Sequence, residues 1–149
     1  MTLTYGTSAQ QRSAYGREAV LSATPVRLLT MLYDRLLLDL GRAEAAQTAG
    51  NWPVASENLL HAQAIVAELN SSLRVDLWDG GQDLQALYTY VSVALVNANV
   101  HRDVALTREG IALLEPLRQA WHEAAALVPA TGAASMDSPT FTGGSLGIG

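Results

Sequence analysis

One stretch decides the fold class: residues 24–43 read TPVRLLTMLYDRLLLDLGRA. Thr24 followed by Pro25 is a strong helix start, because the threonine hydroxyl can cap the first turn and a proline there has no hydrogen bond to lose. Apolar side chains then recur every three or four residues as far as Ala43, which is the spacing of an amphipathic helix. The pattern predicts a helix of about seven turns that ends at Gly50.

Three later segments repeat this pattern. Residues 51–53 read Asn-Trp-Pro and form a second cap-and-proline start, while Asp103 can cap the last segment. Residues 74–83 are rich in Asp and Gly and are expected to form a turn-rich link. Pro116 lies inside the last segment, and we predict a kink there rather than a stop because the apolar spacing continues beyond it. The expected helices are residues 24–50, 51–73, 84–98 and 103–127.

Residues 88–93, Tyr-Thr-Tyr-Val-Ser-Val, also alternate as a strand would. We predict a helix there, because no other segment could pair with such a strand and the helical spacing runs unbroken through Ala98.

Four helices joined by short connections predict an all-α fold, an antiparallel up-and-down four-helix bundle over residues 21–128. Residues 1–20 carry few large apolar side chains and are expected to form a flexible N-terminal arm. Residues 129–149 are rich in Gly, Ser and Pro, so we expect a disordered tail.

Composition excludes several functions. The chain has 149 residues, no Cys, nine basic residues that are all Arg, and a net charge of −5. Without a basic patch it is a poor nucleic-acid binder, and without Cys or Lys it lacks thiol, Cys-based zinc and Schiff-base chemistry. The N-terminus does not resemble a signal peptide and no apolar stretch is long enough to span a membrane, so we expect a cytoplasmic protein with no membrane insertion.

The residues also give no reason to expect an enzyme, a metal or a cofactor. His61, His101 and His122 lie in separate segments, and none has the paired spacing with Glu or His that metal sites in bundles use. Residues 143–147 match the Gly-x-Ser-x-Gly motif of serine hydrolases, but only two residues follow and no sheet is expected to hold the serine.

Two segments have more apolar residues than a bundle core requires. Ten of the fifteen residues from Val26 to Leu40 are apolar, although about three in seven suffice for a core-facing helix. In the third helix Tyr90, Val93, Val96 and Val100 lie off the main apolar stripe. Such surplus favours a partner-binding surface, while a deeply buried helix or a homodimer interface would also explain it.

The residues resemble the flagellar secretion chaperones of the FliS family along residues 14–121. The resemblance implies a helical bundle without enzymatic activity that holds the C-terminal segment of flagellin in apolar grooves between its helices before export. It implies the flagellar export apparatus as a candidate second partner, and an N-terminal arm in which Tyr15 covers the groove. It rests on Ala14-Tyr15, Thr24-Pro25, Leu28-Leu29, Met31 to Asp34, Ala43, Ala62, Ile65-Val66, Glu68-Leu69, Ser72-Leu73, Leu87-Tyr88, Leu95, Ala98-Asn99, Asp103, Leu117-Arg118 and Ala120-Trp121.

Our candidates for the groove walls are the apolar residues of three helices: Leu29, Leu32, Tyr33, Leu36, Ile65, Val66, Leu69, Tyr88 and Val91. Two alternatives stay open. A histidine phosphotransfer domain is also a four-helix bundle, and His61 would be its phosphorylated residue, although the Lys and Gly that usually follow such a histidine are missing. A homodimeric helical module would place the surplus apolar surface between two copies.

Overall fold

The structure, a computed structural model, describes residue 17, residues 23–77 and residues 79–128. The described residues divide into two compact units: residues 31–120 form one, and residues 17, 23–30 and 121–128 belong to the other. Tyr15, most of the predicted arm, the predicted tail and the motif at residues 143–147 lie outside the described residues. The elements are α2 (Pro25–Thr48), α3 (Trp52–Ser72), the short 3₁₀ helix η1 (Val75–Leu77), α4 (Gly81–Val100) and α5 (Val104–Ala126).

The helix starts predicted from caps are confirmed. The side-chain oxygen of Thr24 accepts a hydrogen bond from the Arg27 amide at 3.3 Å, and that of Asp103 accepts one from the Ala105 amide at 3.0 Å. The Asn51 side chain caps α3, whose first turn contains Pro53. These oxygens satisfy amide groups that have no partner within the helix, which explains why the helices begin where they do.

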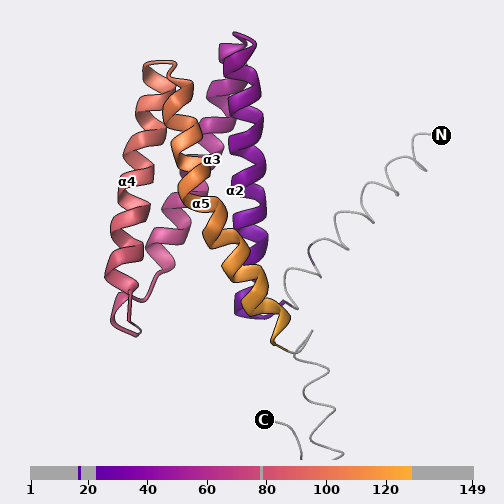
Figure 1. Cartoon of the computed structure of the whole chain (residues 1–149), viewed down its shortest axis with the longest axis vertical. Coiled ribbons are helices and arrows are strands. Elements are labelled where there is room, and N and C mark those ends of the chain that lie inside the picture. Colours follow the sequence, from indigo (N-terminus) through magenta and orange to yellow (C-terminus); the bar gives the residue numbers. More distant parts are fainter. Residues whose placement is uncertain (1–16, 18–22, 78, 129–149) are drawn as a thin grey trace, which may run out of the picture. The chain divides into compact units, whose positions relative to one another are not determined.

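Within residues 31–120 the four helices lie side by side and alternate in direction (Figure 1), as an up-and-down bundle requires. The largest fully buried side chains come from all four helices and form one core: Tyr33, Leu36, Leu40, Leu59, Val66, Tyr88, Val91, Leu95 and Leu114. Gly110 lets α5 approach this core closely, because a Cβ atom there would lie only 3.3 Å from Leu95 Cδ2.

Residues 88–93 are helical within α4, so the strand interpretation is excluded. α4 begins at Gly81. The sequence predicted a link over residues 74–83 and a helix from residue 84, so the helix begins three residues earlier than predicted. The reason is local: Gly80 caps the helix with a φ of 85°, and a Cβ on Gly81 would lie 2.8 Å from the Val75 carbonyl oxygen. Two consecutive glycines therefore permit a tight entry into the helix.

α5 continues through Pro116, so the prediction that this proline does not end the helix is confirmed. None of the helices in the described part of the chain has the length and apolarity needed to cross a membrane.

Candidate functional site

The predicted groove walls lie largely inside the bundle. Seven of them have at most 8% of their surface exposed: Tyr33, Leu36, Ile65, Val66, Leu69, Tyr88 and Val91. Leu29 and Leu32 are half-buried. In this conformation the seven side chains form the core, and contact between them and a client stays a prediction.

A pair of tyrosines joins α2 to α4 in this core. The hydroxyl oxygens of Tyr33 and Tyr88 lie 2.6 Å apart and are hydrogen-bonded. Burial, together with the contact with Tyr33, raises the pKa of Tyr88 above its usual value of 10.0. Tyr88 therefore stays protonated, and its hydrogen bond to Tyr33 acts as a structural link between the two helices.

The outward face of α4 is apolar and exposed, as its surplus of apolar residues predicted. Tyr90 is 51% exposed, Val93 56%, Val96 44% and Val100 68%. Ala86 and Thr89 are also exposed, and the spacing of three and four residues from Ala86 to Val100 puts these side chains along one side of the helix. We call this set the α4 stripe: Ala86, Thr89, Tyr90, Val93, Val96 and Val100.

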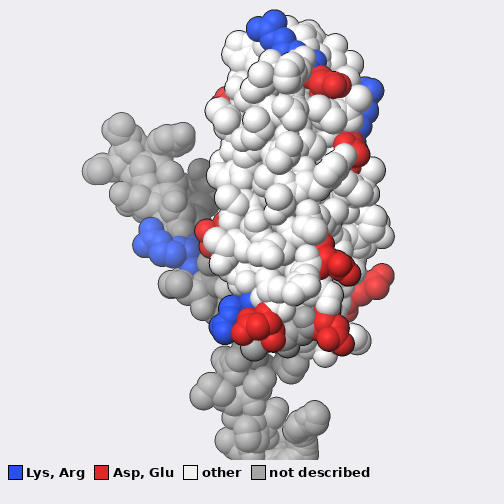
Figure 2. Space-filling model, turned by 90° about the vertical axis from the view of Figure 1, so that its left-hand side faces the viewer, with Lys and Arg blue, Asp and Glu red and all other residues white. Residues whose placement is uncertain are grey.

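The α4 stripe lies on a face with few charges. Asp83, in the first turn, is the single charged residue of α4. Figure 2 looks at this side of the bundle, and uncharged side chains cover the middle of the face while charged ones lie mainly at its edges and ends. A face of this kind offers little to an ionic ligand and can bury apolar surface of a partner.

An open pocket lies at each end of the stripe. The pocket at the N-terminal end of α4 has a volume of about 500 Å³ and is lined by Asp76, Asp79 and Asp83 together with backbone of residues 80–81. The pocket at the C-terminal end has a volume of about 480 Å³ and includes Val100, Arg102 and Trp52. The guanidinium carbon of Arg102 lies 5.0 Å from the centre of the Trp52 ring. The two ends of the stripe therefore differ in charge.

Along its side the stripe is bordered by α5. The Tyr90 hydroxyl donates a hydrogen bond to the Glu109 carboxylate at 2.7 Å, and this contact raises the pKa of Tyr90. The aromatic ring therefore has a fixed polar end, while its exposed face remains available for contact.

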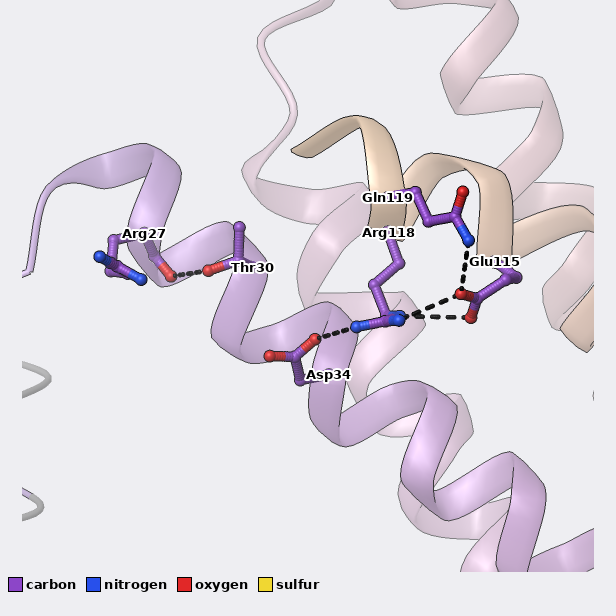
Figure 3. A network of polar contacts seen from close by, with 6 residues as sticks. All are labelled: Arg27, Thr30, Asp34, Glu115, Arg118 and Gln119. Atoms are coloured by element: carbon purple, nitrogen blue, oxygen red, sulfur yellow. Dashed lines mark hydrogen bonds and ion pairs between the residues drawn. The ribbon is translucent and has the colours of Figure 1, made fainter. Parts of the chain in front are cut away.

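Polar contacts also join α2 and α5 at the surface of the bundle (Figure 3). Arg118 donates to Asp34 at 2.9 Å and to Glu115 at 3.1 Å. The hydrogen bonds from Arg118 hold the pKa of Glu115 below its usual value. In the other unit, the Thr30 hydroxyl donates to the Arg27 carbonyl at 2.7 Å. The Arg118 contacts involve partly exposed side chains, so each adds little to the stability of the bundle.

Buried polar groups tie the helices together, and sequence reasoning did not identify them. The Gln47 side chain donates to the Ala98 carbonyl at 3.2 Å and accepts a hydrogen bond from the Thr107 hydroxyl at 2.7 Å. These residues link α2, α4 and α5 in the interior. No local pattern marks such a network, because its partners are more than fifty residues apart in the chain.

His61, the alternative candidate for phosphorylation, is engaged in a structural contact. Its Nδ1 is hydrogen-bonded to the carboxylate of Asp39, which also accepts a hydrogen bond from Arg35 at 3.0 Å. Asp39 is completely buried, so these two side chains compensate a charge that would otherwise be costly in the interior. Across residues 17, 23–77 and 79–128, no three His, Asp or Glu side chains gather as a metal site would require.

Comparison with known proteins agrees with this fold. The model of the family described as "Flagellar protein FliS" matches residues 7–128. A Flagellar secretion chaperone FliS from Bacillus subtilis (strain 168) is 32% identical over 112 residues, which cover 75% of this chain and 84% of that protein. One of the same name from Escherichia coli (strain K12) is 34% identical over 110 residues, 70% of this chain and 79% of that protein.

A solved structure described as the crystal structure of a flagellar chaperone from bacteria has the same fold. Its TM-score is 0.64 at 19% sequence identity, and the match covers 81% of this chain and 99% of that one. Because the family model spans most of the chain and both relatives match along most of their lengths, the chain belongs to the family of the flagellar protein FliS.

Proposed function

We propose that this chain is a cytoplasmic chaperone of flagellar export that binds the C-terminal segment of flagellin and prevents its premature polymerisation. Membership of the FliS family supports the chaperone role. The main observation that supports client binding is the α4 stripe, which is apolar and exposed. Only 15% of the residues of the chain are charged. An amphipathic client helix could bury its apolar side there, at roughly 25 cal/mol per Å² before the cost of ordering the client.

The stripe is the proposed site of first contact because its side chains are already accessible. The seven buried wall residues belong to the core, and they would meet the client directly only if the helices moved apart. The half-buried Leu29 and Leu32 stay proposed client contacts on α2. Tyr15 in the N-terminal arm is proposed to cover apolar surface until the client arrives, and the export apparatus is the proposed destination of the complex.

The test is calorimetric titration of the full chain with a peptide of the last ~40–60 residues of the host's flagellin. Binding by apolar burial is expected to give a clearly negative change in heat capacity, measured as the slope of the binding enthalpy with temperature. Val93→Asp is expected to weaken binding by at least about tenfold, because it places a charge in the middle of the apolar contact.

Leu60→Asp is the matched control. Leu60 is 55% exposed and Val93 is 56% exposed, but Leu60 lies on α3 outside the stripe. We expect it to retain the affinity of the unaltered chain. If both variants bind the peptide equally well, the client does not use the α4 stripe. If neither the unaltered chain nor any variant binds the peptide, the proposed function is wrong. Leu69→Asp is unsuitable, since a charge at a buried position is expected to unfold the bundle.

A further inference from the structure

We propose that the open pocket at the C-terminal end of α4 binds a carboxylate on a peptide segment of a partner protein, with Arg102 as the group that pairs with it. The carboxylate belongs either to an acidic side chain or to a chain end, and the experiment below distinguishes these two sources. The proposal does not rest on the proposed function, because the recognition is ionic and lies beyond the end of α4, whereas the proposed client contact is apolar.

The pocket lies where two turns of the bundle are close together. The turn from α2 to α3 and the turn from α4 to α5 are at the same end of the bundle (Figure 1). The pocket between them has a volume of about 480 Å³, which is within the usual range for pockets that bind small ligands. Its walls include Trp52, Pro53 and Ser56 of α3, Asn99 and Val100 of α4, and Arg102 of the second turn.

A buried side chain fixes this pocket in place. Gln47 of α2 is part of its lining and is only 5% exposed. Its amide donates to the Ala98 carbonyl at 3.2 Å and accepts a hydrogen bond from the Thr107 hydroxyl at 2.7 Å. Three helices are thereby joined beside the pocket, so a ligand does not have to order its walls on binding.

The backbone at Arg102 is one that normally takes glycine. Both α2 and α4 end in a turn closed by a hydrogen bond from an amide to the carbonyl five residues earlier, at 2.8 Å after α2 and 2.9 Å after α4. The residue before that amide has a positive φ in both turns, 74° at Gly50 and 53° at Arg102. Glycine adopts this conformation freely, whereas an arginine is unfavourable there. The turn itself therefore gives no reason for an arginine, and we assign its side chain a role in binding.

The Arg102 side chain presents a positive charge that nothing in the described part of the chain neutralises. Its guanidinium carbon lies 5.0 Å from the centre of the Trp52 ring, and it forms no ion pair with any residue that the structure describes. The adjacent Asp103 uses its carboxylate to cap α5 at the Ala105 amide. Stacking on an indole occupies one face of a guanidinium and leaves its N–H groups free to bind both oxygens of a carboxylate.

The rest of the lining suits a peptide. The side chains of Ser56 and Asn99 form no hydrogen bond with any other described residue, so both can bind a peptide backbone. Pro53 and Val100 offer apolar surface to a neighbouring side chain. A phosphate group carries nearly two negative charges and would find one cation, whereas a carboxylate carries one. The lining therefore favours a carboxylate beside an apolar residue.

The first experiment titrates the full chain with three short peptides and follows the indole N–H signal of Trp52 by NMR, assigned with Trp52→Phe. The peptides are terminally blocked Leu-Glu-Leu, its neutral match Leu-Gln-Leu, and Leu-Leu with a free C-terminal carboxylate. We expect dissociation constants of the order of 1 mM for a carboxylate peptide, because so short a ligand makes few contacts. The tighter of the two carboxylate peptides identifies the source. Equal binding of the neutral peptide, or no change with any peptide, would overturn the proposal.

A pair of matched substitutions tests the cation. Arg102→Gln removes the charge and is expected to weaken binding of the carboxylate peptide at least about tenfold. Arg42→Gln is the control, since Arg42 is also an exposed arginine but lies on α2 outside the pocket. We expect it to bind the peptide as the unaltered chain does. Equal affinities of the two variants would overturn the proposed role of Arg102.

Arg102→Gly separates binding from stability. Glycine relieves the unfavourable backbone conformation, and this gain is expected to outweigh the loss of one exposed stacking contact. The variant should therefore unfold at the temperature of the unaltered chain or above it, and yet lose binding of the carboxylate peptide. A clearly lower unfolding temperature would show that the contact between Arg102 and Trp52 serves the fold, and would overturn the proposal.

The flagellin titration described above is a separate measurement, so the two proposals fail independently. A chain that binds the carboxylate peptide and not flagellin refutes the client alone. A chain that binds flagellin and none of the short peptides refutes the carboxylate site alone.

Discussion

The Tyr88 hydroxyl lies in the bundle interior, where its hydrogen bond to Tyr33 replaces contacts with water. Tyr90, two residues further along α4, instead has its ring at the surface and its hydroxyl on Glu109. Two residues correspond to about 200° of rotation around a helix, which explains why neighbouring tyrosines have opposite environments. The same residue type is therefore a structural link at one position and part of an exposed apolar surface at the other.

This difference leads to a prediction about stability. Tyr33→Phe removes the hydrogen-bond partner of a buried hydroxyl and is expected to lower the free energy of unfolding by about 1–3 kcal/mol. Tyr90→Phe alters an exposed side chain and is expected to leave that free energy unchanged within error. Urea denaturation followed by circular dichroism would measure both. Equal effects of the two substitutions would show that the tyrosine pair does not stabilise the bundle.

At the scale of the helices, two prolines have different consequences because they occupy different positions. Pro53 lies in the first turn of α3, where no intrahelical hydrogen bond is lost. Pro116 lies inside α5, where it removes one such bond and crowds the preceding turn. Packing of α5 against the core, through residues such as Leu114, compensates this local cost.

The same substitution at the two prolines is therefore expected to have opposite effects. Pro116→Ala restores a backbone donor and should raise the free energy of unfolding by about 1–3 kcal/mol. Pro53→Ala increases the freedom of the unfolded chain and should lower it by about 0.4–1 kcal/mol. Denaturant titration of both variants measures the two signs. A loss of stability in Pro116→Ala would indicate that the proline is required by its tertiary surroundings.

For the molecule as a whole, the proposed client binding is expected to raise stability. A ligand that binds only the folded chain raises the free energy of unfolding by about 2.7 kcal/mol when its free concentration is a hundred times its dissociation constant. The α4 stripe contributes little to the core, since its side chains are largely exposed. Changes in the stripe should therefore affect the liganded state and spare the free one.

Thermal unfolding tests this separation. The unaltered chain and Val93→Asp are expected to unfold at similar temperatures alone, because Val93 is 56% exposed. The flagellin peptide should raise the unfolding temperature of the unaltered chain and leave that of Val93→Asp nearly constant. A large destabilisation of Val93→Asp without peptide would mean that the stripe belongs to the core of the folded molecule.

Much of the fold was predictable from local patterns. Thr24, Asn51 and Asp103 mark helix starts because their side-chain oxygens satisfy nearby amides, and this chemistry acts over three residues or fewer. The surplus of apolar residues on α4 likewise predicted its exposed stripe, because a helix of known period can turn only one side to a core. The groove residues were harder to assign, since composition does not distinguish an apolar wall from an apolar core.

The sequence by itself determined the four helices and their starts, because caps and helical spacing act between residues that are close in the chain. Tertiary structure alone decided which of the candidate groove walls are buried: it placed Ile65 and Val66 in the core and left Leu32 half-buried. It also decided that Gln47 meets Thr107 and that Asp39 meets His61. The physical reason is that burial and long-range hydrogen bonds depend on how whole helices pack, and no local rule of sequence records that packing.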